Sequence, residues 1–399
     1  MTQAETPVPK APTSEPEAGA DDVRVKLFAR TDVGQVREHN EDNFLVADLT
    51  RRSRGLLEAN RATTIGHQGA VFAVCDGMGG AAAGEIASQL AVDIIYERLV
   101  DGLNDRPLKR DELARRLVRA VEAAGLRIFH EAKADRSRRG MGTTVTAAAL
   151  VDDVLFFAQV GDSRGYVLRG DTLVQLTRDQ SLVNQLIEAG QLTEEEAETF
   201  EHNNIILQAL GTSDTVQVDL TFAEIRRGDV LLLCSDGLSG MVRFDEIREI
   251  LKANSEPLEV CKALTERANA AGGHDNITVI IVQFDGPGIK AAAEGEQLKY
   301  RKYVLSDEAL SDTAPVVHAN AAAVPGSPGP PNATNDSGAA AARPVSAPPP
   351  GWQEPGSHVG EYDPNAIEIP GTHVPVWMVV GIVVGVIILL AGTAFLLLR

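Results

Sequence analysis

Cysteine and basic side chains are both scarce in this chain of 399 residues. Two of the three cysteines, Cys75, Cys234 and Cys261, lie in apolar, strand-like runs. This placement excludes a disulfide framework and is typical of reduced core thiols in a cytosolic domain. Lys and Arg number 37 against 56 Asp and Glu, which gives a formal net charge of -19. The Arg clusters at 51–54 and 136–139 are too short to form a compensating basic stripe, so nucleic acid is not an expected partner.

The start of the chain lacks an apolar stretch, whereas its end carries a long one. Residues 1–22 are acidic and rich in proline, so we expect a disordered extension rather than a signal peptide. Residues 286–375 consist mainly of Ala, Pro, Gly, Ser and Asn, and cannot bury enough apolar surface to offset the entropy of ordering. Residues 376–398 are apolar throughout, and as a helix they would reach roughly 34 Å, enough to cross a ~30 Å hydrocarbon core. The sequence therefore predicts a disordered linker followed by one C-terminal transmembrane helix.

The charges that flank this apolar run predict its orientation. Basic residues before it outnumber the single Arg399 after it, which favours a cytoplasmic position for the folded part. We therefore expect a single-pass membrane protein with its folded domain in the cytoplasm. A buried core helix is the alternative, but no second domain is expected that could bury it. Gly381 and Gly385 have the spacing that allows two helices to approach closely, so a homodimer through this segment stays open.

Residues 23–285 carry the periodic patterns of one folded domain. Alternating or continuous apolar runs predict strands at 23–29, 44–47, 70–75, 143–151, 154–160, 165–168, 172–176, 216–225, 230–234 and 277–284. Helical spacing predicts helices at 85–99, 111–133, 244–251 and 258–271. Residues 51–69 are expected to be irregular, and 181–210 to form a helical, polar insertion, called the insertion below. Because strands and helix pairs are segregated, the pattern indicates an α+β fold with antiparallel sheets.

Acid-bearing turns beside strand-like runs are the strongest functional signal. There are five such turns: Asn40-Glu41-Asp42, Asp76-Gly77-Met78-Gly79-Gly80, Gly161-Asp162-Ser163-Arg164, Ser235-Asp236-Gly237 and His274-Asp275-Asn276. This pattern predicts several strand ends that direct carboxylates to one point. Neighbouring carboxylates disfavour each other's ionisation, so a cation should hold them. Oxygen ligands with no accompanying Cys or His pair favour Mg²⁺ or Mn²⁺ over zinc.

Six motifs, taken in order and spacing, resemble those of a known family. They are Arg37 with Asn40-Glu41-Asp42, then the stretches 74–80, 141–144, 161–164, 233–238 and 273–278. Over residues 23–285 the chain resembles the type 2C, metal-dependent protein serine/threonine phosphatases of the PPM family, in their bacterial form. The resemblance implies two packed antiparallel β-sheets flanked by helix pairs, an α-β-β-α sandwich with metals at one edge.

The resemblance also implies a role for each acid. Asp76 would bridge two cations, Mn²⁺ or Mg²⁺, and the Gly77 carbonyl would complete the coordination of one of them. Asp236 and Asp275 would hold the other. Asp162, together with Asp236, would form a weaker third site. A water or hydroxide shared by the two cations would then attack the phosphorus atom.

Three further residues have implied roles around the substrate. Arg37 would clamp the phosphoryl oxygens, because a planar guanidinium offers paired donors. Glu41 and Asp42 would form hydrogen bonds or bind through metal waters. Met78 stands where eukaryotic-type relatives carry a histidine that could protonate the leaving group. His39 is the nearest histidine in sequence, but its alternative interpretation is an exposed loop residue.

Other positions depart from the common bacterial pattern. Ala81 and Gln180 stand where relatives often have histidine, and Gln208 stands where they often have arginine. None of the three is an expected metal ligand, so the departures concern contacts of the insertion and substrate preference.

The resemblance implies hydrolysis of phosphoserine and phosphothreonine in proteins, and the predicted transmembrane helix would place this activity close to the membrane. The expected partners are phosphorylated proteins, in particular membrane serine/threonine kinases and their substrates. A catalytically weak scaffold that binds phosphoproteins is one alternative. A hydrolase that uses the same metals on a small phosphate ester or phosphodiester is another, although no nucleotide-binding Gly-rich loop is present.

Overall fold

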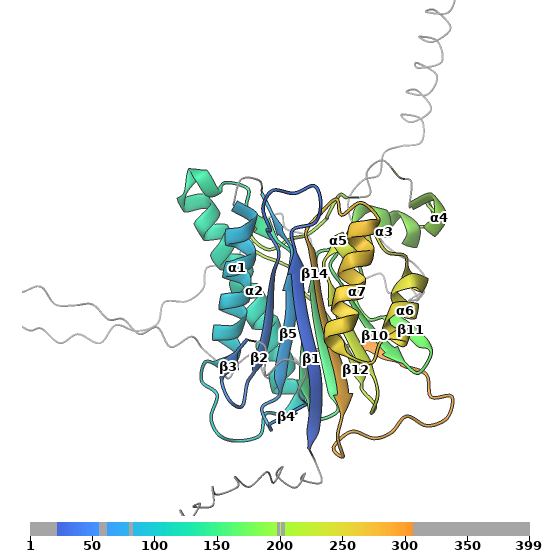
Figure 1. Ribbon diagram of the computed structural model, residues 1–399. Helices are drawn as coiled ribbons and strands as arrows, with labels where there is room; N and C mark the ends of the chain where they lie inside the picture. The colour runs from blue at the N-terminus through green and yellow to red at the C-terminus, as the bar shows by residue number, and fades with distance from the viewer. Residues whose placement is uncertain (1–21, 56–61, 80–82, 198–199, 201–203, 306–399) are drawn as a thin grey trace, which may run out of the picture. The chain divides into compact units, whose positions relative to one another are not determined.

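The computed structural model describes residues 22–55, 62–79, 83–197, 200 and 204–305 (Figure 1). Internal contacts divide the chain into two units, Met1–Val316 and Val317–Arg399, and every described residue belongs to the first. The predicted N-terminal extension, apart from residue 22, and the predicted transmembrane segment lie outside the described residues. Within the part that is described, no helix is both long and apolar enough to cross a bilayer.

Two large antiparallel sheets form the centre of the fold. One has six strands, in the order β11 (Thr172–Gln175), β10 (Arg164–Arg169), β13 (Val230–Cys234), β14 (Ile277–Asp285), β1 (Val23–Asp32) and β4 (Thr63–Ile65). The other has seven, in the order β15 (Tyr300–Lys302), β12 (Asp219–Glu224), β9 (Val154–Val160), β8 (Val145–Val151), β5 (Ala70–Cys75), β2 (Asn43–Asp48) and β3 (Ser53–Arg54). A separate two-stranded ribbon pairs β6 (Gly77–Met78) with β7 (Gly142–Thr143).

Helices cover the outer face of each sheet (Figure 1). The long helices α1 (Ala83–Val100) and α2 (Arg110–Ala134) pack on the seven-stranded sheet, and a short 3₁₀ helix, η1 (Arg136–Arg138), follows them. On the six-stranded sheet lie α5 (Asp236–Ser239), α6 (Phe244–Ala253) and α7 (Pro257–Ala270). The insertion contains α3 (Leu182–Glu188) and α4 (Glu194–Ala197). This arrangement confirms the predicted α-β-β-α sandwich.

The core between the sheets follows from the two-residue period of the strands. In β1 the side chains of Val23, Val25, Leu27 and Ala29 are buried, and the residues between them are partly exposed. In β14 both faces are buried, because its alternate residues face the second sheet and α7. A strand buried on both sides reads as a continuous apolar run, which explains the pattern at 277–284.

Two sequence predictions need correction. The region 51–69 contains the short strands β3 and β4, which form sheet edges rather than an irregular excursion. The predicted linker begins too early, because residues 286–305, called the strap below, are ordered. Ile289 and Leu298 of the strap are buried, and β15 pairs with β12. Tyr303 lies edge-on against Phe156 and Phe222, so pairing and aromatic packing hold a segment whose composition resembles a linker.

Candidate active site

Five aspartates lie where strands of the two sheets end or begin. Asp76 directly follows β5, and Asp162 lies in the turn between β9 and β10. Asp236 opens α5 just after β13, and Asp275 lies two positions before β14. Asp42 precedes β2 and is buried. The apolar strands thus deliver their terminal acids to one region, as the sequence predicts.

Burial and neighbouring charges raise the pKa values of four of these acids. Burial raises the pKa of Asp76 well above its ordinary value, and three neighbouring carboxylates raise it further. These neighbours are Asp42, Asp236 and Asp162. Burial and the charge of Asp275 likewise raise the pKa of Asp236, which shares a hydrogen bond with Asp76. Sharing a proton is the expected response of two carboxylates that cannot both ionise.

Asp42 and Asp162 respond in the same way. Burial raises the pKa of Asp42 to about 7 against the pull of hydrogen bonds from Thr278 and Ser235, and the charge of Asp236 adds to it. Burial, together with the charge of Asp236, also raises the pKa of Asp162 to about 7. The region therefore carries more negative charge than its own residues compensate.

Unpartnered oxygens give a second sign that this cluster suits a cation. Among the described residues, the buried Oδ1 atoms of Asp42, Asp162 and Asp236 accept no hydrogen bond. A buried polar atom without a partner costs roughly 1–3 kcal/mol, and more when it is charged. Hard divalent cations bind carboxylate oxygens, so the donor set fits Mg²⁺ or Mn²⁺. In the described part of the chain, however, no three Asp, Glu, His or Cys side chains already stand as the ligand set of one ion.

Asp275 forms an ion pair with a basic side chain, Arg37. Arg37 Nη2 donates to its Oδ2 at 2.6 Å, and half of the Arg37 side chain is exposed. The hydrogen bond to Asp275 raises the pKa of Arg37, as do the charges of Glu41 and Asp236. The structure thus brings Arg37, predicted to bind the phosphoryl group, next to a predicted ligand.

Asn276 holds the loop that carries Arg37, and sequence analysis assigned it no role. Its Oδ1 accepts from the backbone N–H of Glu41 at 2.7 Å. Its Nδ2 donates to the carbonyl oxygens of Val33 at 3.0 Å and His39 at 2.9 Å. The position of Asn276 within the motif at 273–278 was the one sequence feature that could have pointed to this role. The His39 side chain itself is exposed, which agrees with its interpretation as a loop residue.

Glycine is required next to Asp76, at position 77. A Cβ on Gly77 would overlap the carbonyl oxygens of Gly84 and Glu41, so no side chain fits there. The Gly77 N–H donates to the Glu41 carbonyl at 3.2 Å, which fixes the turn after β5. The Glu41 carboxylate lies against Gly84 in α1, whose N-terminal turn favours negative charge.

Hydroxyl groups position the Asp76 turn from the other side. Thr143 Oγ1 donates to the Asp76 carbonyl at 2.8 Å, and Thr144 Oγ1 accepts from the Asp76 N–H at 3.1 Å. Ser235 Oγ donates to Asp42 Oδ2 at 2.7 Å. These residues lie inside the motifs found in the sequence, but their partners are far away along the chain. The local sequence pattern therefore could not predict these contacts.

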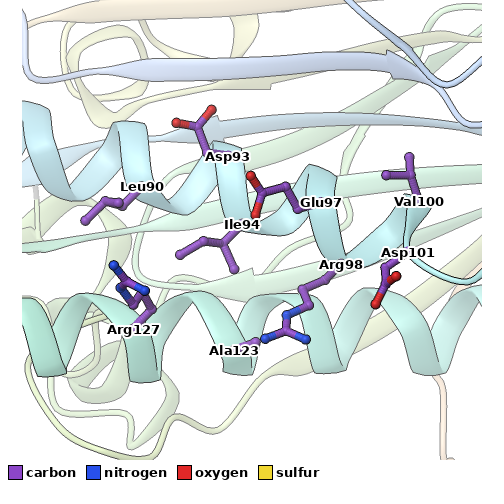
Figure 2. A pocket seen from close by; sticks show the side chains of 9 residues that line it. All are labelled: Leu90, Asp93, Ile94, Glu97, Arg98, Val100, Asp101, Ala123 and Arg127. Carbon is purple, nitrogen blue, oxygen red and sulfur yellow. The ribbon is translucent and has the colours of Figure 1, made fainter. Parts of the chain in front are cut away.

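A concave region lies away from these acids. A groove of about 630 Å³ runs between α1 and α2 (Figure 2). It is lined by Leu90, Asp93, Ile94, Glu97, Arg98, Val100, Asp101, Ala123 and Arg127. None of them is a predicted site residue, and Asp93 is already paired with Arg54. The acidic cluster therefore remains the candidate site.

A two-sheet sandwich with clustered acids at its strand ends is the architecture of a metal-dependent phosphatase. The family model described as protein phosphatase 2C matches residues 53–273. The serine/threonine phosphatase stp of Listeria innocua is 37% identical over 254 residues, which cover 64% of this chain and 94% of that protein. The protein phosphatase PhpP of Streptococcus pneumoniae is 38% identical over 261 residues, which cover 65% of this chain and 98% of that protein.

Solved structures agree with this assignment. The phosphatase PstP of Mycobacterium tuberculosis matches with a TM-score of 0.55 at 35% identity, covering 66% of this chain and all of that one. A PstP catalytic domain in complex with two manganese ions matches with a TM-score of 0.54 at 34% identity, covering 66% of this chain and 100% of that one. The chain therefore belongs to the protein phosphatase 2C (PPM) family of bacterial protein serine/threonine phosphatases, whose members use Mn²⁺ or Mg²⁺.

Proposed function

We propose that the acidic cluster binds two divalent cations, Mn²⁺ or Mg²⁺, and that the enzyme uses them to hydrolyse phosphoserine and phosphothreonine in proteins. Asp76 would serve both ions, with the Gly77 carbonyl completing one site and Asp236 and Asp275 the other. Asp162 would join Asp236 in a weaker third site. The observation that carries this assignment is the set of buried carboxylates with unpartnered oxygens and raised pKa values.

Each part of the site then has a chemical task. When bound, the cations would lower the pKa of a water molecule and offset the charge that develops on the phosphoryl group. Arg37, which is half exposed beside Asp275, can turn its free N–H groups to the phosphoryl oxygens. Glu41 and Asp42 would accept hydrogen bonds from ordered waters, and Ser235 holds Asp42 in place for this.

Substitution of Asp76 tests the proposal. The full chain carrying Asp76→Asn, assayed with Mn²⁺ on a phosphothreonine peptide, is expected to lose turnover by about 10³-fold or more, because both ions lose a shared ligand. Asp152→Asn is the matched control, since Asp152 is exposed in the turn between β8 and β9. If Asp76→Asn keeps wild-type turnover, or if chelation leaves activity intact, the assignment is wrong.

The alternatives give different outcomes in the same assays. A phosphoprotein-binding scaffold would retain phosphopeptide affinity with no metal-dependent release of phosphate. A hydrolase of small esters would show higher kcat/KM on a small aryl phosphate than on a phosphopeptide. The protein phosphatases among the relatives favour the peptide substrate.

We also propose the arrangement of the remaining chain. Residues 1–22 would be an extension, the sequence after the strap up to residue 375 a linker, and 376–398 a membrane-spanning helix. The catalytic domain would then act in the cytoplasm on membrane serine/threonine kinases and their substrates. The uninterrupted apolar composition of 376–398 supports this part of the proposal. A homodimer through Gly381 and Gly385 is testable by crosslinking the full chain in membranes.

A further inference from the structure

The two ends of the insertion are joined next to the acidic cluster. Ser181 and Ile206 form an isolated β-bridge, and the Leu182 N–H donates to the Ile205 carbonyl at 2.9 Å. The Leu207 N–H donates to the Gln180 carbonyl at 2.8 Å. The insertion therefore leaves and rejoins the domain at one point, and Gln180 lies directly at that point.

The side chain of Gln180 links the insertion to the Gly161 turn by hydrogen bonds. Its Oε1 accepts from the N–H of Gly161 at 2.9 Å and from Nε2 of Gln208 at 3.0 Å. Gln208 in turn exchanges two hydrogen bonds of 2.7 Å with the backbone of Gln217. We call the pair Gln180 and Gln208 the glutamine clasp. One amide oxygen thus connects both ends of the insertion to the turn that carries Asp162.

The turn at Gly161 is held from its other side by the core. Gln159 Nε2 donates to the carbonyl oxygens of Gly161 at 3.0 Å and Ser163 at 2.7 Å. Ser163 Oγ shares a 2.8 Å hydrogen bond with Thr144, which also holds the Asp76 N–H. Only glycine fits at position 161, because φ is +102° and an added Cβ would lie 2.6 Å from the Thr144 side chain. The Asp162 turn therefore lies between a rigid core network and the clasp.

We propose that Gln180 is a positioning residue, which couples the placement of the insertion to the placement of the Asp162 carboxylate. A shift of either end of the insertion changes the hydrogen bond that Gln180 gives the Gly161 N–H, and Asp162 is the next residue. The buried Oδ1 of Asp162 has no hydrogen-bond partner among the described residues, so no side chain fixes this atom through a hydrogen bond. The metal half of this inference rests on the proposed role of Asp162 as a ligand.

Hydrogen exchange of the metal-free full chain tests the clasp without using activity. Gln180→Met removes the amide at nearly constant length. Gln208→Met leaves the Gln180 side chain in place but removes its donor, together with the two hydrogen bonds to the Gln217 backbone. Both variants are expected to speed amide exchange at Gly161 or in the stem residues 205–207, by about five- to tenfold, because hydrogen bonds of the clasp are lost. Gln180→Met should affect both places, and Gln208→Met mainly the stem. Gln185→Met is the matched control, since Gln185 is exposed on α3 and its side chain has no hydrogen bond in the described structure.

Mn²⁺ binding, measured by titration with detection of free Mn²⁺ by electron paramagnetic resonance, tests the coupling. Gln180→Met is expected to weaken the weakest Mn²⁺ site by about threefold or more, and to have no further effect on Mn²⁺ binding when combined with Asp162→Asn.

Unchanged exchange at Gly161 in Gln180→Met would overturn the clasp. Faster exchange with unchanged Mn²⁺ binding would overturn the coupling. If Asp162→Asn alone leaves Mn²⁺ binding unchanged, the proposed ligand role fails, and exchange at Gly161 still decides the clasp.

Discussion

Several carboxylates in this protein are buried close to one another, although burial and mutual repulsion both disfavour their charged form. Asp42, Asp76, Asp162 and Asp236 are brought together by strands whose other residues are buried and apolar. Burial and mutual repulsion raise the pKa of each. The sequence predicts this grouping, because strand-like runs that end in acids are a local pattern. Hydrogen bonds that span long stretches of chain, such as that of Ser235 to Asp42, depend on tertiary packing and leave no such pattern.

Stability of the metal-free enzyme should depend on pH through these groups. In Asp42 and Asp162 the pKa rises from 3.8 to about 7 on folding, so the folded chain binds their protons more tightly than the unfolded chain. The free energy of unfolding should therefore fall as pH rises from about 4 to about 7. Urea unfolding in chelator is expected to show a lower midpoint at about pH 8 than at about pH 5.

Two controls isolate the carboxylates in that experiment. Asp42→Asn removes one of the groups, so the difference between the two pH values should shrink. Saturating Mn²⁺ should raise stability most at the higher pH, where the ligands are deprotonated. A metal-free protein that becomes more stable between about pH 5 and about pH 8 would contradict this interpretation.

At the scale of elements, the loop between β1 and β2 is held by an amide side chain that lies 235 positions after Glu41 in the chain. Asn276 is buried and makes three hydrogen bonds to this loop. Asn276→Ala is expected to lower the free energy of unfolding by about 2–4 kcal/mol, because three backbone groups lose a partner. It should also raise KM for a phosphopeptide more than it lowers kcat, because Arg37 lies on this loop.

Urea denaturation and steady-state kinetics check this prediction. Asn204→Ala is the matched control, since Asn204 is exposed and its side chain makes no hydrogen bond within the described residues. Equal stability of the Asn276→Ala and Asn204→Ala proteins would show that the loop holds its place without the amide.

The strap is an element that local sequence could not predict. Its strand β15 has three residues, and its stability comes from β12 and from Tyr303 rather than from any periodic pattern. Tyr303 Oη donates to Asp111 Oδ1 at 2.9 Å, and its ring packs at 5.2 Å from that of Phe156. Long, regular elements such as α2 and β14 were predicted because their periodic patterns extend over many residues.

Truncation measures the contribution of the strap. The free energy of unfolding of a chain that ends at residue 285 should be about 3–5 kcal/mol lower than that of a chain that ends at 305. The reason is that Ile289, Leu298 and the Tyr303 ring no longer bury apolar surface. Tyr303→Phe in the longer chain should cost about 1 kcal/mol, the value of its hydroxyl contact. Identical unfolding curves for the two truncated chains would mean that the strap adds nothing to the fold.

At the scale of the whole molecule, the proposed membrane helix should determine where the enzyme is located without changing the catalytic activity of its domain. The linker would behave as a coil with a reach of roughly 50 Å, which raises the effective concentration of the domain near membrane substrates without changing its site. The full chain should sediment with membranes, whereas a chain that ends at residue 305 should not. Both should show the same kcat/KM on a free phosphopeptide, because the described site lies entirely within residues 22–305. On a phosphorylated kinase embedded in vesicles, the full chain should be about tenfold or more faster at equal concentration. Equal rates on the embedded kinase, or a full chain that stays in the supernatant, would contradict the membrane tether and leave the assignment of the catalytic site intact.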